Sequence, residues 1–171
     1  GNFDTGAEQG QFWVAPFDSW KNSVILQGDL EKLHFDLFWL RSDGGFGDAH
    51  LAGINIENSE TEHGRFGAMF INIYSGDALN YDGLEVWNLR ALDVPVPFFP
   101  RLKFYGEVVW QLGEDADALN SQNDGFGFYL EGAYTVPYVS WETILTYRYA
   151  RFSGDVSTSI ENESYRPLFY G

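Results

Sequence analysis

Hydrophobic and polar residues alternate along the segment RLKFYGEVVWQLGED, which runs from Arg101 to Asp115. The apolar positions are every second residue from Leu102 to Leu112, and the positions between them are largely polar. A period of two residues places the two sets on opposite faces of a β-strand. In a soluble protein the apolar face would cover a core, whereas in a transmembrane barrel it would face lipid. The alternation therefore predicts a strand and leaves both kinds of protein open.

Similar alternation recurs along the whole chain and predicts about nine strands in a single domain covering residues 1–171. The predicted strands are residues 9–15, 20–27, 31–41, 47–57, 64–74, 83–92, 101–112, 125–135 and 139–152. Several have the ~9 to 11 residues that a tilted strand needs to cross a bilayer, whereas soluble strands usually have about 5 or 6. No run approaches the ~18 to 20 consecutive apolar residues of a membrane-spanning helix.

The connections between the predicted strands differ at the two ends of the sheet. One end is rich in Gly, Asp, Asn and Ser and carries residues 42–48, 75–83, 113–125 and 153–171. The other end carries a short turn at Gly28 and Asp29 and the segments 57–63, 93–100 and 136–138. Outer-membrane barrels place longer loops outside the cell and shorter turns in the periplasm. The asymmetry here is partial, because 57–63 and 93–100 are not short.

Composition favours an all-β protein, because aromatic residues make up 18% of the chain and Gly contributes 19 residues. The aromatic residues gather near predicted strand ends, as in the membrane-interface girdle of a barrel, a β-sandwich rim or a sugar-binding platform. The net charge is −15 and the ten basic residues are scattered, so we expect no nucleic-acid partner. The chain has no cysteine, which excludes disulfides and thiolate metal sites.

Residues typical of catalysis or metal binding are sparse. His34, His50 and His63 lie far apart in the sequence and are interpreted as isolated histidines. Acidic clusters such as Asp77 with Asp82 lack the ordered ligand spacing of a calcium loop. We therefore expect no enzyme activity, no metal and no cofactor.

Polar residues opposite the apolar stripes form the most informative set. Charged residues that face lipid at mid-depth cost about 2 to 4 kcal/mol for Arg or Lys, so a barrel would turn them toward its lumen. In a soluble sheet the same residues would form a solvent-exposed face with cross-strand ion pairs. The predicted pore-lining residues are Arg90, Lys103, Glu107, Gln111, Glu131, Glu142 and Arg148.

Several segments together resemble the alginate-export family of outer-membrane β-barrels. These are LKFYGEVVWQLGED, GFGFYLEGAYTV, VSWETILTYRYARFSGD and YRPLFYG. The matching features are Glu107, Gln111 and Gly113; Gly132, Ala133 and Tyr134; Ser153, Gly154 and Asp155; and Pro167, Leu168 and Phe169. The resemblance implies a barrel of many strands, of which this chain supplies about nine, with the remaining strands or a partner chain needed for closure. The family's lumen is basic and guides a polyanion, whereas the predicted inner face here is mixed in charge.

The sequence thus predicts an all-β, antiparallel up-and-down transmembrane β-barrel segment in a bacterial-type outer membrane. We expect a porin-like channel that contacts outer-membrane lipid and passes small hydrophilic or charged solutes by diffusion. Two alternatives remain open: a barrel that serves as a scaffold or sheath for a partner protein, and a soluble β-sandwich that binds carbohydrate.

Overall fold

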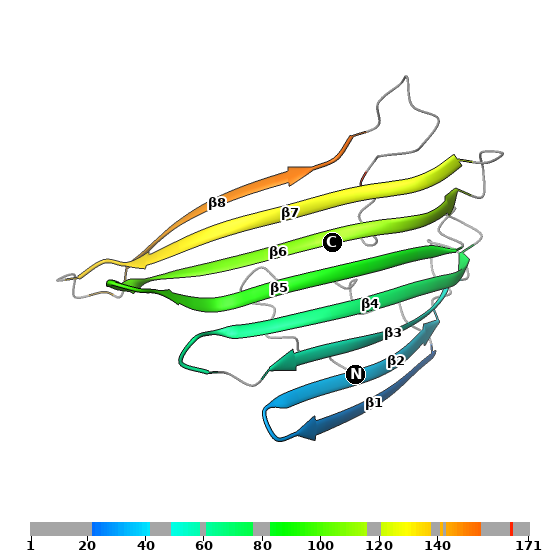
Figure 1. Cartoon of the computed structure of the whole chain (residues 1–171), viewed down its shortest axis with the longest axis horizontal. Coiled ribbons are helices and arrows are strands. Elements are labelled where there is room, and N and C mark those ends of the chain that lie inside the picture. The colour runs from blue at the N-terminus through cyan, green and yellow to red at the C-terminus, as the bar shows by residue number, and fades with distance from the viewer. Residues whose placement is uncertain are drawn as a thin grey trace.

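The computed structural model describes residues 22–41, 49–58, 61–76, 83–115, 121–137, 141, 143–154 and 165. These residues form one eight-stranded antiparallel sheet in which the strands follow one another in chain order, with β1 and β8 at its edges (Figure 1). The strands are β1 (Asn22–Leu30), β2 (Leu33–Arg41), β3 (Ala49–Asn58), β4 (Arg65–Gly76), β5 (Leu84–Val96), β6 (Phe99–Asp115), β7 (Ser121–Thr135) and β8 (Ile144–Phe152). No helix long and apolar enough to span a membrane occurs in this part of the chain.

Eight of the predicted strands correspond to β1 to β8, and the strand predicted at residues 9–15 lies outside the described residues. The all-β, up-and-down antiparallel architecture is therefore confirmed. The sheet is open rather than closed into a barrel, because no pairing between β1 and β8 occurs in the described residues. The connections β2–β3, β4–β5 and β6–β7 share one end of the sheet, here called the loop end. The opposite end is called the turn end.

The position of the β1–β2 turn was predicted wrongly. Gly28 and Asp29 belong to β1, where they pair with Phe35 and His34 of β2. The turn instead consists of Glu31 and Lys32, the two residues between the last paired positions of the hairpin. Glu31 has φ 53°, a left-handed conformation that two-residue hairpin turns require. Gly is a typical turn residue, and for that reason the turn was predicted at Gly28.

The segment 93–100 was expected to be a longer connection, and this expectation is also wrong. β5 continues to Val96 and β6 begins at Phe99, so the turn between them has two residues, Pro97 and Phe98. Proline presets φ at the first central position of a turn, and Phe98 follows with φ 71°. The turn end is therefore shorter here than the sequence suggested.

The two faces of the sheet differ in polarity and in burial. The face that carries Asp36, Asn88 and Glu107 is called the inner face, and these three polar side chains are buried. The inner face also carries a buried apolar cluster near the loop end: Phe38, Leu40, Leu51, Ile71, Ile73, Leu84, Val86 and Val109.

The opposite, outer face carries the apolar stripe of β6 and its equivalents on the other strands, and many of these side chains are exposed. Large exposed side chains of the outer face include Leu26, Leu37, Trp87, Leu89, Phe104, Leu112, Leu130, Leu145, Tyr147 and Tyr149.

Gly53 is a packing constraint in the middle of the sheet, beneath the ring of Phe38. A Cβ at this position would meet that ring and would lie 2.5 Å from the backbone carbonyl oxygen of Phe70 on β4. Gly53→Ala should therefore lower the free energy of unfolding by about 1 to 3 kcal/mol, because overpacking forces the backbone to shift. Urea titration of the folded chain measures this loss.

Gly154→Ala is the matched control, since a Cβ there has no atom within 4 Å. Its urea midpoint should stay at the wild-type value. Equal midpoints for both variants would contradict the close approach of β3 and β4 at Gly53.

Candidate functional site

Six of the seven predicted pore-lining residues are described, and all six belong to the inner face. Arg90 of β5 pairs with Glu107 of β6, and Lys103, Glu107 and Gln111 alternate along that strand. Glu131 of β7 pairs with Tyr105 of β6 on one side and with Arg148 of β8 on the other. Glu142 lies outside the described residues.

The Arg90 guanidinium is the centre of the inner-face polar network. Its Nε and Nη2 donate to Oε2 of Glu57 at 3.1 and 2.9 Å, and Nη2 also donates to Oδ1 of Asn55 at 2.6 Å. The side chain is only 11% exposed and crosses β4 above Gly67, where a Cβ would lie 2.8 Å from Cζ. The absence of a side chain at Gly67 therefore lets β3 and β5 make charge-assisted hydrogen bonds across the strand between them.

A second part of the network joins β5 to β6. Asn88 donates from Nδ2 to Oε1 of Glu107 at 2.5 Å and accepts from Nη1 of Arg90 at 3.4 Å. Glu107 is 6% exposed and Asn88 is 1% exposed. A carboxyl group withdrawn from water this far requires hydrogen-bond partners and a nearby cation, and both are present.

The network continues to the β1 edge through Asp36. Its carboxylate accepts from Gln27 at 2.9 Å and from Asn55 at 2.8 Å, and lies 3.0 Å from Nε2 of His34. The other ring nitrogen of His34 lies 2.8 Å from Asp29. The interpretation of His34 as an isolated histidine is therefore wrong, because it bridges two carboxylates.

These contacts together form one network, which we call the inner-face ladder. It runs in order through Asp29, His34, Asp36, Asn55, Arg90, Asn88 and Glu107, and Glu57 is bound to it through Arg90.

Asp93 is the centre of a smaller cluster near the turn end. The β5–β6 register shifts between Ala91 and Val94, so that Leu92 and Asp93 together stand opposite Tyr105 in a β-bulge. Asp93 has φ 55°, and its carboxylate accepts from Tyr105 at 2.8 Å and from Lys103 at 3.0 Å. Arg65 of β4 lies 3.5 Å from the same carboxylate. The bulge thus pairs Lys103, a predicted pore-lining residue, with Asp93, which was expected to lie in a connection.

The remaining predicted residues lie apart from the ladder. Arg148 donates from Nε to Oε2 of Glu131 at 2.6 Å and stands 5.3 Å from the centre of the Tyr129 ring. Gln111 is fully buried opposite Val86, within the apolar part of the inner face. The structure therefore brings Arg90 and Glu107 together, and leaves Lys103, Gln111 and the Glu131–Arg148 pair in separate surroundings.

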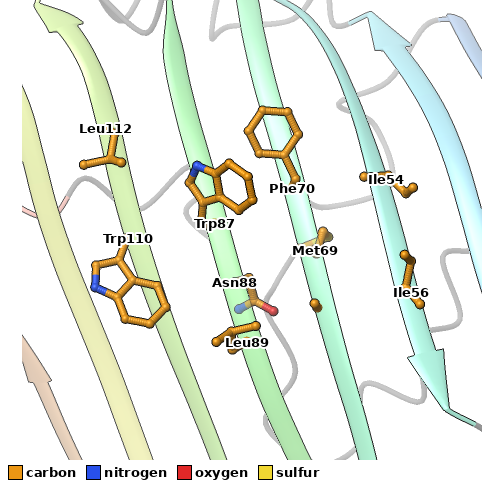
Figure 2. A pocket seen from close by; sticks show the side chains of 10 residues that line it. Ile54, Ile56, Met69, Phe70, Trp87, Asn88, Leu89, Trp110 and Leu112 are labelled. Atoms are coloured by element: carbon orange, nitrogen blue, oxygen red, sulfur yellow. The ribbon is translucent and has the colours of Figure 1, made fainter.

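The outer face carries an apolar hollow of about 510 Å³ over the middle of the sheet. Figure 2 shows its lining, in which Phe70, Trp87 and Trp110 stand on neighbouring strands β4, β5 and β6. The rings of Phe70 and Trp87 are 4.5 Å apart. The lining is mostly indole, phenyl and aliphatic surface, which favours an apolar neighbour.

Near the loop end, polar and aromatic residues follow the apolar stripe of the outer face. Asn72, Glu85 and Asp124 occupy one cross-strand row of the outer face with Leu112. Close to this level on β2 to β4, Trp39 donates to the Tyr74 hydroxyl, and the His50 ring lies 5.9 and 5.8 Å from their two rings. Aromatic rings with polar tips beside an apolar surface are typical of a membrane interface.

No protein-family model matches the chain, and neither the curated proteins nor the solved structures contain a match. The resemblance to the alginate-export family stays a prediction. Within the described ranges, no group of three or more His, Asp or Glu side chains could hold a metal ion.

Replacing Arg90 should destabilise the sheet more than replacing any exposed cation. Arg90→Met removes the two hydrogen bonds that Arg90 donates to Glu57 and leaves that carboxylate only Arg65, at 3.8 Å, so the loss should be about 1.5 to 3 kcal/mol. Arg90→Lys should lose less, because it keeps the charge and loses only the planar fork of donors. The free energy of unfolding of each variant is measured by urea titration.

Lys32→Met is the matched control, because Lys32 is an exposed residue of the β1–β2 turn. It should change the urea midpoint by much less. If Arg90→Met and Lys32→Met shift the midpoint equally, the inner-face ladder does not stabilise the sheet.

Proposed function

We propose that this chain is part of an outer-membrane β-barrel whose inner face lines a passage for small hydrophilic or charged solutes. The observation that carries the proposal is the distribution of side chains between the two faces. Outer-face side chains such as Trp87, Leu145 and Tyr147 are 47%, 61% and 75% exposed, whereas the charged ladder is on the inner face. Soluble monomers rarely expose contiguous apolar patches above a few hundred Å². Contact with lipid would remove the free-energy cost of exposing these apolar side chains to water.

The length of the outer-face stripe fits a bilayer. The stripe on β6 runs from Leu102 to Leu112, which at about 3.4 Å per residue corresponds to roughly 34 Å along the strand. A strand tilt of ~40° reduces the height to about 26 Å, close to the ~25 Å apolar band of outer-membrane barrels. The row of Asn72, Glu85 and Asp124 and the cluster around His50 then stand at the level of the headgroups.

The two open edges of the described sheet require further strands if the sheet lies in a membrane. Within the described residues, β1 and β8 each have one neighbour, and a strand edge with unpaired backbone groups is not tolerated in lipid. The proposed barrel therefore includes further strands, from this chain or from a partner chain.

The ion pairs of the inner face support passage of small solutes rather than of a polyanion. The four cations Arg65, Arg90, Lys103 and Arg148 each have a carboxylate within 4.0 Å. Asp36 and Glu107 add further acidic groups to the network. The local field of such a wall favours cations over anions, which differs from the basic lumen of an alginate exporter.

A second candidate is a barrel that sheathes a partner protein. The observation that favours it is the buried apolar cluster of the inner face, where Val86 is 0% exposed. An apolar inner wall suits a filled lumen better than a water-filled one. Such a barrel would not conduct ions while the partner is bound, and conductance across a planar bilayer separates the two candidates.

The soluble β-sandwich requires the stripes of β6 and β8 to be buried against a second sheet. In the part of the chain that the structure describes there is one sheet, and Phe104, Leu112 and Leu145 are exposed. This arrangement does not favour a sandwich.

Two positions on neighbouring strands test which face meets lipid. Leu130 of β7 lies on the outer face opposite Gly106, near the middle of the stripe, and Thr146 of β8 lies on the inner face opposite Ala133. Leu130→Arg should prevent insertion into liposomes, since Arg at mid-depth of the apolar band costs about 2 to 4 kcal/mol. Thr146→Arg should insert like the wild type.

Insertion is measured by flotation with liposomes and by a heat-dependent shift in gel mobility. Equal behaviour of the two Arg variants would overturn the lipid-facing assignment of the outer face. A wild-type chain that stays monomeric in buffer without detergent would overturn the barrel itself.

The Glu131–Arg148 pair should influence ion selectivity. Glu131→Gln removes one carboxylate from the inner face, so the reversal potential in a KCl gradient should move toward anion selectivity. Arg148→Gln should move it in the opposite direction by a similar amount. Identical reversal potentials for wild type and both variants would exclude this pair from the conducting path.

A further inference from the structure

The hairpin of β1 and β2, at one edge of the sheet, contains a histidine whose two ring nitrogens both face carboxylates (Figure 1). Nδ1 of His34 lies 2.8 Å from Oδ1 of Asp29, and Nε2 lies 3.0 Å from Oδ1 of Asp36. A carboxylate only accepts hydrogen bonds, whereas a neutral imidazole has one donor nitrogen and one acceptor nitrogen. Both contacts are therefore hydrogen bonds only when each nitrogen carries a proton and the ring is a cation.

The carboxylate of Asp36 is buried, and it connects the first three strands. It accepts hydrogen bonds from the side-chain amides of Gln27 on β1 and Asn55 on β3, which are both neutral. In the part of the chain that the structure describes, the ring of His34 is the only basic group within 4.0 Å of this carboxylate. A buried charge is costly unless an opposite charge accompanies it, so the burial of Asp36 depends on the proton of His34.

Other carboxylates of the inner face pair with side chains that keep their charge near neutral pH. These pairs are Glu57 with Arg90, Asp93 with Lys103 and Glu131 with Arg148. Histidine is different, because it loses its proton within the physiological pH range. The β1 end of the inner-face ladder is thus the part whose ion pairing changes with pH.

Acidic groups face His34 from both neighbouring strands and from its own strand. Asp29 stands opposite it on β1, Glu57 stands opposite it on β3, and Asp36 follows it by two residues on β2. The turn adds Glu31 and Lys32, which are both exposed. A neutral ring would place an unprotonated nitrogen against one of the two carboxylates that it contacts, and the two charged contacts would be lost.

We propose that His34 is a pH-sensitive switch, which holds β1 to the rest of the sheet while it is protonated and weakens that attachment when it loses the proton. Within the described residues β1 pairs only with β2, so the β1–β2 contacts decide how firmly this strand is held. The stability that the two charged contacts contribute is complete at low pH and is lost as the pH rises through the titration of the ring. The inference goes beyond the proposed function and does not depend on it, because the contacts lie within the sheet.

Urea titrations of the wild type and of His34→Gln between about pH 5.5 and pH 8.5 test the proposal, since histidine titrates in this range and aspartate stays charged. The unfolding equilibrium constant of the wild type should rise on the order of tenfold more than that of the variant, as expected for the loss of a hydrogen bond to a charged group. Gln stays neutral throughout and has no such transition. Other titrating groups of the inner face, such as Glu107, are present in both chains, so the difference between the two curves reports on His34.

His63→Gln is the matched control, because the His63 side chain is 79% exposed and lies 3.5 Å from an equally exposed carboxylate, that of Glu62. It should keep the pH dependence of the wild type. Identical curves for the wild type and His34→Gln would overturn the proposal. A His63→Gln variant that loses the pH dependence as fully as His34→Gln would overturn it as well.

Amide hydrogen exchange of the wild type tests the same switch without any variant, so it decides the proposal even if His34→Gln does not fold. Exchange is measured at about pH 6 and about pH 8.5, on either side of the histidine titration, and corrected for the intrinsic exchange rate at each pH. Protection of the β1 amides should fall several-fold at the higher pH, while that of β6 stays the same. Unchanged protection of β1, or an equal loss in β1 and β6, would show that His34 does not control the attachment of β1.

Discussion

The contact between Arg90 and Glu57 is the interaction on which the polar half of this sheet depends. It spans β4 above Gly67 and joins strands that are not hydrogen-bonded neighbours. A slip of one residue in β3 or β5 would carry one of the two charges to the opposite face, away from the other. In most sheets the hydrophobic pattern sets the register. Here an alternative register would also separate a buried ion pair, which costs free energy because each charge loses its partner.

The sheet combines this polar inner wall with an outer face of exposed aromatic and aliphatic side chains. The two faces require different surroundings, because burial of the ladder costs desolvation while exposure of the outer face costs hydrophobic free energy. In the proposed barrel, lipid outside and a polar interior would satisfy both requirements at once. The apolar cluster at the loop end belongs to the inner face as well, so that face changes from apolar to charged along the strands. A passage along this wall would be most polar toward the turn end.

In the proposed barrel, ion pairing would determine how the inner wall interacts with solutes. Cations such as Arg148 and Lys103 are neutralised by carboxylates of adjacent positions, so they present little free positive charge. A wall of this kind does not attract a polyanion, whatever family the strand pattern resembles.

The sequence alone predicted the strands and their faces, because a period of two residues is a local property. Residues such as Lys103, Glu107 and Gln111 were placed on one face by counting along a single strand, and the structure agrees. Turn positions were less predictable: Gly28 suggested a turn where Glu31 adopts the left-handed conformation instead. Periodicity gives the face of a side chain and not its neighbour on the next strand. Contacts between strands form only after the registers and the β5 bulge are set. Such contacts join Glu57 to Arg90, His34 to Asp29, and the Tyr165 ring to Gly127. Tertiary structure alone therefore decided the inner-face ladder and the position of the Tyr165 ring.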